Sequence, residues 1–495
     1  MLNKVKNLNP THMTTNKQQG SPLYLISIVL VAVLGGLLFG YDTAVISGAE
    51  KGLQAFFQSA GDFTYTDGLH GFTTSSALIG CVIGALLSGL LSSRIGRRRT
   101  LLIAGILFFL SALGSYDPEF LFFPHGVASK GVLVAFILYR VLGGIGVGLA
   151  SAICPMYIAE VAPANQRGKL VSWNQFAIIF GQLVVYFVNF LIIQSHKNDP
   201  QIVEWTNTIG WRNMFVSEAF PAGLFALLIL LVPESPRHLV MRGLDKDAFR
   251  ILSRINGEEK AHAILQEIKE TVVEKREKLF AYGFIVIFIG CMLSVFQQVI
   301  GINAVLYFAP RIFESMGVSN NMLFTVIMGI INISFTLLAV FTVEKLGRKP
   351  LLISGSIGMA VGALGVALSN VVSLPAWVPV ISIMVYSACF MFSWGPICWV
   401  YISEIFPNTI RSQATAWAVA FQWIFNFIVS STFVPMYNMK LGTMGDSFGH
   451  FFAYALYGLI CIVAAIFVWR LVPETKGKTL EEMTALWRSR MKKKN

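Results

Sequence analysis

The chain has 495 residues and a mean hydropathy of +0.65; 55% of its residues are hydrophobic and only 13% are charged. A soluble protein could not cover that much apolar surface, so the composition indicates a polytopic membrane protein. The formal net charge of +12 does not indicate a nucleic-acid surface, because most of the basic residues flank apolar segments on one side of the predicted membrane.

Twelve mostly apolar stretches are long enough to cross a hydrocarbon core of about 30 Å at about 1.5 Å per residue. They predict helices at residues 23–48, 71–93, 100–116, 131–155, 169–194, 211–232, 281–307, 323–343, 351–371, 375–400, 414–437 and 450–471. The first stretch is too long for the apolar part of a signal peptide, so we expect it to remain as a helix. The sequence therefore predicts an all-α membrane protein with twelve transmembrane helices.

Lysine and arginine are distributed unequally between the connecting segments. With the N-terminus in the cytoplasm, 31 basic residues lie on that side and six on the other, while Arg140 lies inside a predicted helix. Because basic residues near helix ends resist translocation, we expect both termini to be cytoplasmic.

Three short charged motifs occur twice, after corresponding helices. "RIGRRR" at 94–99 matches "KLGRKP" at 345–350, "YIAEVAPANQR" at 157–167 matches "YISEIFPNTIR" at 401–411, and "PESPR" at 233–237 matches "PETKG" at 473–477. Matching positions are 240 to 251 residues apart, which indicates two parallel six-helix halves around a site near the membrane midplane.

We expect the charged residues of these motifs to pair across the two halves and form a cytoplasmic gate. The alternative is that they only set the topology, which would explain the basic residues but not the recurring glutamates. The predicted gate residues are Arg97, Glu160, Arg167, Glu234, Arg348, Glu404, Arg411 and Glu474.

These patterns divide the chain into five parts. We expect a flexible cytoplasmic N-terminus (1–22), an N-terminal six-helix bundle (23–232), a cytoplasmic linker (233–280), a C-terminal six-helix bundle (281–472) and a basic cytoplasmic tail (473–495). The linker contains 10 basic and 9 acidic residues at helical spacing, which predicts short amphipathic helices under the bundle.

In combination, the motifs closely resemble those of the sugar porter family of the major facilitator superfamily, over residues 23 to 480. The resemblance implies a fold that alternates between outward-open and inward-open states, a sugar bound mainly by the second half, and a bacterial inner membrane. The stretches "GGLLFGYDTAVISG", "NQFAIIFGQL", "FQQVIGINAVLYFAP" and "SWGPICWV" are most similar to family members that carry D-xylose with protons, so D-xylose is the expected substrate.

Asp42, Arg140 and Glu218 are ionisable residues inside predicted helices of the first half, at similar depth. Such a residue costs about 2.5–3.5 kcal/mol at the bilayer centre, so it is rare unless paired or functional. The three carry a net charge of −1 when ionised, and one proton neutralises them. We predict a proton-coupling site here, and the resemblance implies that Asp42 is protonated. The alternative is a static ion pair that only fixes helix packing.

Amide and tryptophan side chains gather on the predicted helices 5, 7, 10 and 11. Amides bond sugar hydroxyls, and aromatic rings cover the apolar faces of the ring. The resemblance implies sugar contacts at Gln175, Gln297, Gln298, Asn303, Trp399 and Gln422, with Phe39, Tyr307, Asn332, Gly395 and Trp423 nearby; Gln182 joins them because it lies on the same helix face as Gln175. The alternative is that these amides bond neighbouring helices.

Other functions are excluded or left open by the motifs. The sequence has no GxxxxGK[ST] phosphate loop and no HExxH motif, so we expect neither an ATP-driven pump nor an enzyme. We expect a monomer with no metal and no cofactor, and protons as the coupling ion. A passive sugar facilitator remains open, as does a sugar sensor, although a sensor would be expected to have a longer cytoplasmic extension. The choice between pentose and hexose also remains open.

Overall fold

The computed structural model describes residues 20–120, 122–163, 166–272, 278–372, 374–441, 445–476 and 480–492. Within these residues, twelve helical segments are long and apolar enough to cross a membrane. The only strand-like feature among them is an isolated bridge between Leu441 and Gly445. The predicted all-α architecture with twelve transmembrane helices is therefore confirmed.

The first half contains six spanning segments. These are α1 (Pro22–Gln58), α2 (Asp67–Ile95), α3 (Arg97–Tyr116), α4 (Lys130–Val161), α5 (Arg167–Gln194), and a sixth that joins α6 (Ile202–Trp205), η1 (Thr206–Gly210), α7 (Trp211–Val216), α8 (Ala219–Leu228) and η2 (Ile229–Leu231). Helix α2 packs along α4, and α1 packs along α5. Glycine makes this possible, because a Cβ at Gly144 would lie 1.8 Å from the Ala77 carbonyl oxygen.

The second half repeats the arrangement with two broken helices. It consists of α12 (Phe284–Val299), α13 (Ile302–Tyr307), α14 (Ala309–Ser315), α15 (Asn321–Leu346), α16 (Arg348–Ser369), α17 (Trp377–Phe392), α18 (Trp394–Ile405), α19 (Asn408–Tyr437) and α20 (Asp446–Leu471). Gly301 separates α12 from α13 with φ at +89°, a conformation that favours glycine. Ser393 separates α17 from α18.

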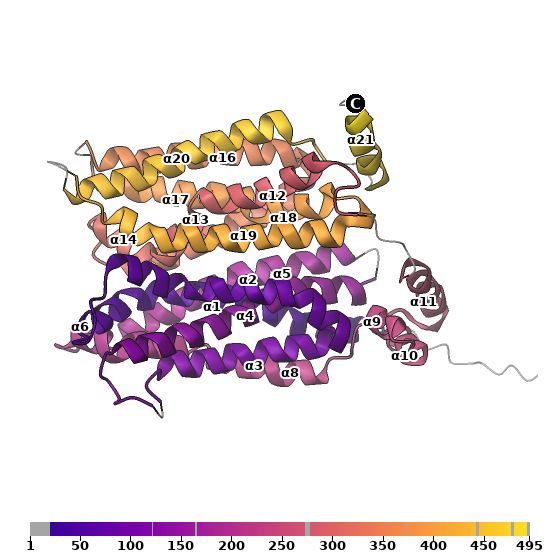
Figure 1. The fold of residues 1–495 in the computed structure, drawn as a ribbon, viewed down its shortest axis with the longest axis horizontal. Helices are drawn as coiled ribbons and strands as arrows, with labels where there is room; N and C mark the ends of the chain where they lie inside the picture. The colour runs from indigo at the N-terminus through magenta and orange to yellow at the C-terminus, as the bar shows by residue number, and fades with distance from the viewer. Residues whose placement is uncertain are drawn as a thin grey trace, which may run out of the picture.

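Figure 1 shows the two halves side by side, with the first half in indigo to magenta and the second in rose-red through orange to yellow. They meet where α2 packs against α19 and where α5 packs against α15. We call the end of the bundle that carries α9 (Pro236–Met241), α10 (Asp245–Asn256), α11 (Glu258–Val272) and α21 (Leu480–Lys492) the linker end. The opposite end, near α6 and α14, is the loop end.

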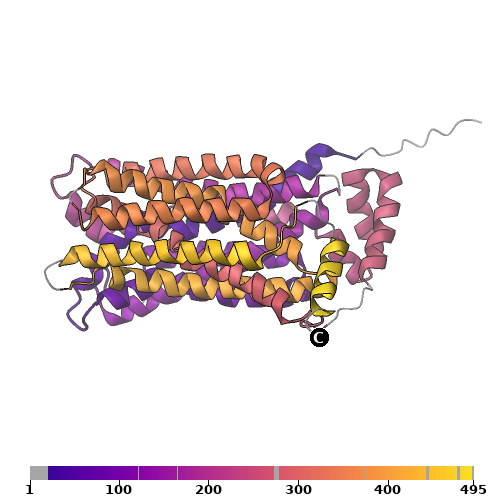
Figure 2. The same ribbon diagram turned by 90° about the horizontal axis from the view of Figure 1, so that it is seen from above.

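The short helices at the linker end confirm the predicted amphipathic linker, and Figure 2 shows them beside the bundle. Helix α21 was not predicted, because its sequence reads only as a basic tail. It docks on the second half through the indole of Trp487, which donates a hydrogen bond to the Ile405 carbonyl at 3.0 Å. Most of the predicted flexible N-terminus, residues 1–19, lies outside the described residues.

The two largest errors in the predicted helix boundaries are in the first and sixth segments. Helix α1 continues to Gln58, and the sixth segment begins at Ile202 instead of 211. The apolar pattern stops at 48, but the polar residues Glu50 and Gln54 have partners that let the helix continue. Asp42 and Glu218, which were predicted to lie at similar depth, nevertheless lie beside each other.

Candidate functional site

Asp42 and Arg140 form a buried ion pair between α1 and α4. Arg140 Nη1 donates to Asp42 Oδ1 at 2.6 Å, and Nη2 donates to the Asp42 carbonyl at 3.2 Å. Glu218 lies beside this pair at 0% exposure. Within the described residues, both Glu218 carboxyl oxygens and Asp42 Oδ2 have no hydrogen-bond partner. A buried carboxylate without donors is costly, and Arg140 supplies one positive charge for the two acids.

Mostly apolar and neutral groups enclose the cluster. The Phe215 ring centre lies 5.1 Å from the guanidinium carbon of Arg140, and the Tyr41 hydroxyl lies 2.7 Å from Ser217 Oγ. A Cβ at Gly143 would lie 3.3 Å from Asp42 Oδ1 and still closer to Ser111, so glycine leaves room for the carboxylate. Charges interact strongly in such surroundings because the effective dielectric constant is low.

A cavity lies between the two halves, next to the break in the seventh spanning segment. Its lining includes all seven predicted sugar contacts and four of the five predicted neighbours: Gln175, Gln182, Gln297, Gln298, Asn303, Trp399 and Gln422, with Phe39, Tyr307, Gly395 and Trp423. The structure thus brings together residues from α1, α5, α12, α13, α18 and α19. Their role in sugar binding stays a prediction.

The amides of the second half form one hydrogen-bonded network. Gln297 Nε2 donates to the Trp394 carbonyl at 2.9 Å and to the Gly395 carbonyl at 3.2 Å. Its Oε1 accepts from Gln422 and, at 3.4 Å, from Gln298. The break at Ser393 allows Gln297 to reach these carbonyls, so the helix break orients the amide side chain.

Asn303 extends this network, since its Nδ2 donates to Gln298 Oε1 at 2.6 Å. The Oε1 of Gln422 and the indole nitrogen of Trp423 have no hydrogen-bond partner within the described residues. These two groups can therefore bond a polyhydroxylated ligand without breaking an existing bond.

Asn332 does not line the cavity, although it was predicted to lie near the sugar. It is buried behind the lining, where its Oδ1 accepts from the Ser387 hydroxyl at 2.7 Å. The lining also contains Thr43, Thr336 and Asn426, which the sequence analysis missed. The signal for Asn426 was its position four residues after Gln422, which places both on one helix face.

Helix α1 connects the cavity to the cluster of Asp42, Arg140 and Glu218. Phe39 and Thr43 line the cavity, while Asp42 bonds Arg140 from the same helical turn. The Phe39 ring also lies 5.5 Å from the ring of Trp423 in the second half. A change at Asp42 can therefore reach the ligand cavity through one rigid element.

The repeated motifs form the same structure in each half at the linker end. Arg97 binds Glu160 at 2.8 Å, and Arg348 binds Glu404 at 2.7 Å. Glu234 accepts the backbone N–H of Arg97 at 2.8 Å, and Glu474 accepts that of Arg348 at 3.0 Å. Glu234 and Glu474 thus each cap a helix N-terminus, where a carboxylate is favourable.

Our expectation that these residues pair across the halves is wrong for both ion pairs, which each lie within one half. The reason is local, because Arg97 and Arg348 are each the first residue of a helix, and that position lies beside the glutamate of the same half. Of the other predicted gate residues, Arg167 is exposed at the start of α5, and Nε of Arg411 donates to the Phe406 carbonyl at 3.4 Å. Their role in a gate stays a prediction.

Pairs that do cross between the halves lie at the loop end. Arg311 on α14 binds Glu50 on α1 through two hydrogen bonds of 3.0 and 2.7 Å. Asn438 donates to Asp67 at 2.9 Å, and Lys51 pairs with Glu314. The sequence analysis missed this network, because its acidic members stand at or beyond the ends of the predicted apolar stretches.

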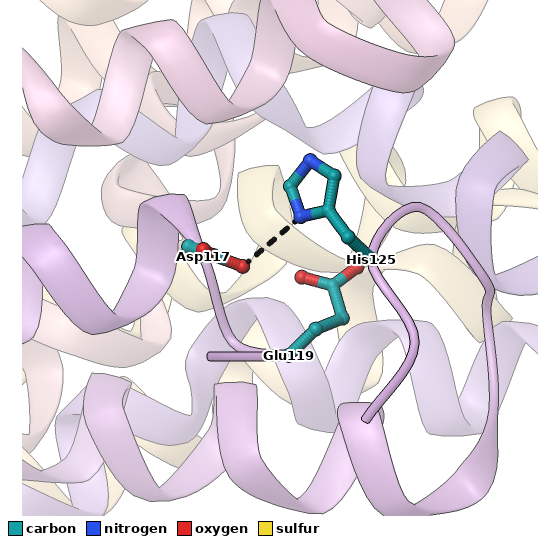
Figure 3. Close-up of side chains that lie close together, drawn as sticks. All are labelled: Asp117, Glu119 and His125. Carbon is teal, nitrogen blue, oxygen red and sulfur yellow. Dashed lines mark hydrogen bonds and ion pairs between the residues drawn. The ribbon is translucent and has the colours of Figure 1, made fainter. Parts of the chain in front are cut away.

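Asp117, Glu119 and His125 lie close together in the connection between α3 and α4 (Figure 3). Both Glu119 oxygens are held by Arg212, at 2.7 and 2.5 Å. Burial raises the pKa of Glu119, but the hydrogen bonds and charge of Arg212 outweigh it and hold the pKa below its usual range. A cation would have to displace Arg212, so we interpret the group as a clamp that fastens the connection to α7.

Comparison with known proteins places this architecture in a family. A family model described as "Sugar (and other) transporter" matches residues 28–487. The chain belongs to the sugar transporter family. Over 483 residues it is 50% identical to the D-xylose-proton symporter of Escherichia coli K12, covering 95% of this chain and 97% of that protein. It is also 37% identical to the glucose facilitated diffusion protein of Zymomonas mobilis, covering 96% of this chain and all of that one.

The solved structures give the same result for the fold of this sugar transporter. An inward-open structure of the xylose transporter XylE from E. coli superposes with a TM-score of 0.83 at 49% identity, covering 94% of this chain and 100% of that chain. The expected major facilitator fold is therefore confirmed. Both coupled symport and facilitated diffusion occur among these relatives, so the coupling chemistry must be argued from the residues.

Proposed function

We propose that this protein imports a monosaccharide in symport with a proton by alternating access, and that D-xylose is its substrate. The observation that carries the proposal is the buried Asp42–Arg140 pair with Glu218 unpartnered beside it, one helical turn from the cavity that the two halves share. The 50% identical relative is a D-xylose-proton symporter, which supports the choice of sugar and of coupling ion.

The cluster can carry one proton per cycle. Two ionised acids and one arginine leave a net negative charge in a low-dielectric site, whereas one proton makes the cluster neutral. A proton on Asp42 would weaken its bond to Arg140, and loss of the proton would restore that bond. The two states therefore differ in the position of α1 relative to α4.

The sugar cavity responds because α1 contributes to both sites. Release of Asp42 from Arg140 would let Phe39 and Thr43 move toward the amides of the second half. Closure around the sugar then depends on the proton, which is what couples the two substrates. No cofactor is needed for this cycle, and protons are the coupling ion.

The orientation follows from charge. We propose that the linker end faces the cytoplasm with both termini, because the basic residues are concentrated there. The loop-end pairs join the two halves, and in the proposed orientation they close the outer side; the match to an inward-open relative supports this. We further propose that the protein lies in a bacterial inner membrane and acts as a monomer.

The test is transport by purified protein in liposomes. Under an imposed inward proton gradient, wild type should concentrate labelled D-xylose above equilibrium, whereas Asp42→Asn should only exchange it. Asp247→Asn makes the same change at an exposed acid of α10 and serves as the control that should keep accumulation. Equilibration without accumulation by the wild type would identify a facilitator, and no movement of D-xylose would overturn the assigned sugar.

A further inference from the structure

A second group of buried ionisable side chains lies at the loop end, apart from the Asp42 cluster. Glu50 and His70 are both 0% exposed, on α1 and α2 of the first half. Arg311, on α14 of the second half, has a side chain that is 13% exposed. Its guanidinium bonds both oxygens of Glu50 and also the side chain of Gln54. The only full positive charge bonded to Glu50 within the described residues thus comes from the opposite half.

Both ring nitrogens of His70 have a hydrogen-bond partner when the ring is neutral. Its Nε2 lies 3.1 Å from Glu50 Oε2 and can donate to it. Its Nδ1 lies 3.1 Å from the Tyr65 hydroxyl, which can donate to it. With Glu50 ionised and Arg311 charged, the closed group is neutral and needs no further proton.

Separation of the halves at the loop end would change this balance. Glu50 and His70 would stay together, because α1 and α2 belong to one half, but Arg311 would leave with α14. Glu50 would then keep its negative charge with only the His70 N–H as a donor. Loss of a partner from a buried pair is strongly destabilising, and a proton on His70 would replace the lost positive charge.

The other charged groups nearby favour the same result. Asp67 lies one turn before His70 on α2, so its negative charge stays with His70 in the first half when the halves separate. Lys51 follows Glu50 on α1 and pairs with Glu314 on the second half, so it also loses its partner when the halves separate, but its side chain is 39% exposed. The hydroxyls of Tyr65 and Tyr437 complete the surroundings; Tyr437 bonds Ser315 on the α14 side. Of the described neighbours in the first half, His70 is the one that is bonded to Glu50 and can take up a proton there.

We propose that Glu50, His70 and Arg311 form a second proton-binding site, which takes up one proton from outside when the loop end opens and releases it to the same side when the loop end closes. The proton binds at His70 as Arg311 departs, so total charge around Glu50 stays balanced. Because the proton returns to the side from which it came, the site drives no accumulation. It sets how readily the outer side opens at a given external pH.

The inference goes beyond the coupling role of Asp42 and requires only that the halves separate at the loop end. It is tested without transport, by measuring the distance between the halves in nanodiscs. Spin labels at Val203→Cys and Met439→Cys, which are 70% and 48% exposed on opposite halves at the loop end, report the open fraction. The background is Asp42→Asn with the six native cysteines replaced, so that the coupling proton does not contribute at Asp42.

In this background the ratio of open to closed molecules should rise as the pH falls from 8 to 5, by up to about tenfold per pH unit where one proton is linked to opening. His70→Gln should remove most of this pH dependence. Arg311→Gln should raise the open fraction at pH 7.5. A Lys51→Gln, Glu314→Gln double variant removes another pair between the halves whose side chains are 39% and 55% exposed, and it should keep the pH dependence of its parent.

An unchanged pH profile in His70→Gln would overturn the proposal. If that variant does not fold, Glu50→Gln provides the second reading, because without the bonded anion His70 loses most of the gain from protonation and the profile should again flatten. A pH dependence that persists in Glu50→Gln, or that disappears equally in the Lys51 and Glu314 control, would also overturn it. Failure of sugar transport in liposomes would leave these distances unaffected.

Discussion

The two halves of the molecule share one helical plan but bury different polar chemistry around the central cavity. The first half buries an acid paired with an arginine and a second acid beside them, Asp42, Arg140 and Glu218. The second half buries an amide network centred on Gln297 and supported by breaks at Gly301 and Ser393. Charge is concentrated in one bundle and neutral hydrogen bonding in the other.

This difference has a physical basis. An ionised group responds strongly to one proton because its interaction energy with neighbours changes by a full charge. Amides do not titrate in this range, so their geometry can stay constant while they bond sugar hydroxyls. Because the amide network lies in the second half, a proton taken up in the first half can change the relation between the halves without disturbing that network.

The strongest challenge to this comparison is Arg140→Gln. It leaves two acids without their cation, and breaking a buried pair typically costs about 3–5 kcal/mol. We expect proton-driven accumulation to fall by more than about 100-fold, while D-xylose affinity measured by calorimetry changes by less than about threefold. Arg212→Gln removes the buried arginine that binds Glu119 and serves as the control for general destabilisation. An equal loss of accumulation in both variants would contradict a specific coupling role.

The converse variant is Gln297→Ala, which should disturb the sugar and spare the proton chemistry. Losing these hydrogen bonds costs about 1–3 kcal/mol, so the dissociation constant for D-xylose should rise roughly 10 to 100 fold. The dependence of binding on pH should keep its midpoint. Asn370→Ala, an amide at the end of α16 that bonds the Val366 carbonyl, is the matched control and should bind normally. A shifted midpoint in Gln297→Ala would show that the two chemistries are not separated.

Phe39→Ala sharpens the comparison at the place where the halves meet. The Phe39 ring contacts Trp423 across the cavity, and such a ring pair contributes about 0.5–1.5 kcal/mol. We expect D-xylose affinity to fall about three- to tenfold, less than in Gln297→Ala. Calorimetric titration of both variants checks the order. A larger loss in Phe39→Ala would mean that the first half dominates binding.

The smallest expected effect concerns His238, which lies on α9 and whose Nδ1 is 3.1 Å from Arg97 Nη1. Burial lowers the pKa of His238, and Arg97 adds to this although Glu234 opposes it. Because the folded pKa is below the unfolded value, the detached α9 takes up a proton first, and its docking should weaken as the pH falls below about 6.5.

Hydrogen exchange of α9 at pH 7.5 and 5.5, corrected for the intrinsic rate, measures this weakening. We expect the protection free energy of the α9 amides to fall by less than about 1 kcal/mol, because only His238 titrates. His238→Gln should remove the pH dependence and leave exchange in α16 unchanged. Equal protection of wild-type α9 at both pH values would contradict the prediction.

Several of these features were predictable from the sequence for clear reasons. Asp42 and Arg140 stand out because a charge in an apolar stretch is rare, and the repeated motifs reveal two halves by their spacing. The loop-end group was missed because Glu50 and His70 lie at the polar ends of their segments, where charges are ordinary. The partners in the linker-end motifs were predicted wrongly, because the sequence allows Arg97 to face either half. Its position beside Glu160 in the folded protein decides which glutamate it binds.

The sequence by itself determined the twelve apolar segments, the two parallel halves and the identity of the buried polar groups, because hydropathy and spacing are local properties. Only the tertiary structure decided which groups meet. Asp42 and Arg140 are 98 residues apart, and Glu50 and Arg311 are 261 apart, so their pairing depends on how whole helices pack. The ion pairs that join the halves at the loop end and stay within each half at the linker end follow from that packing, because electrostatic pairing requires approach to within a few ångströms.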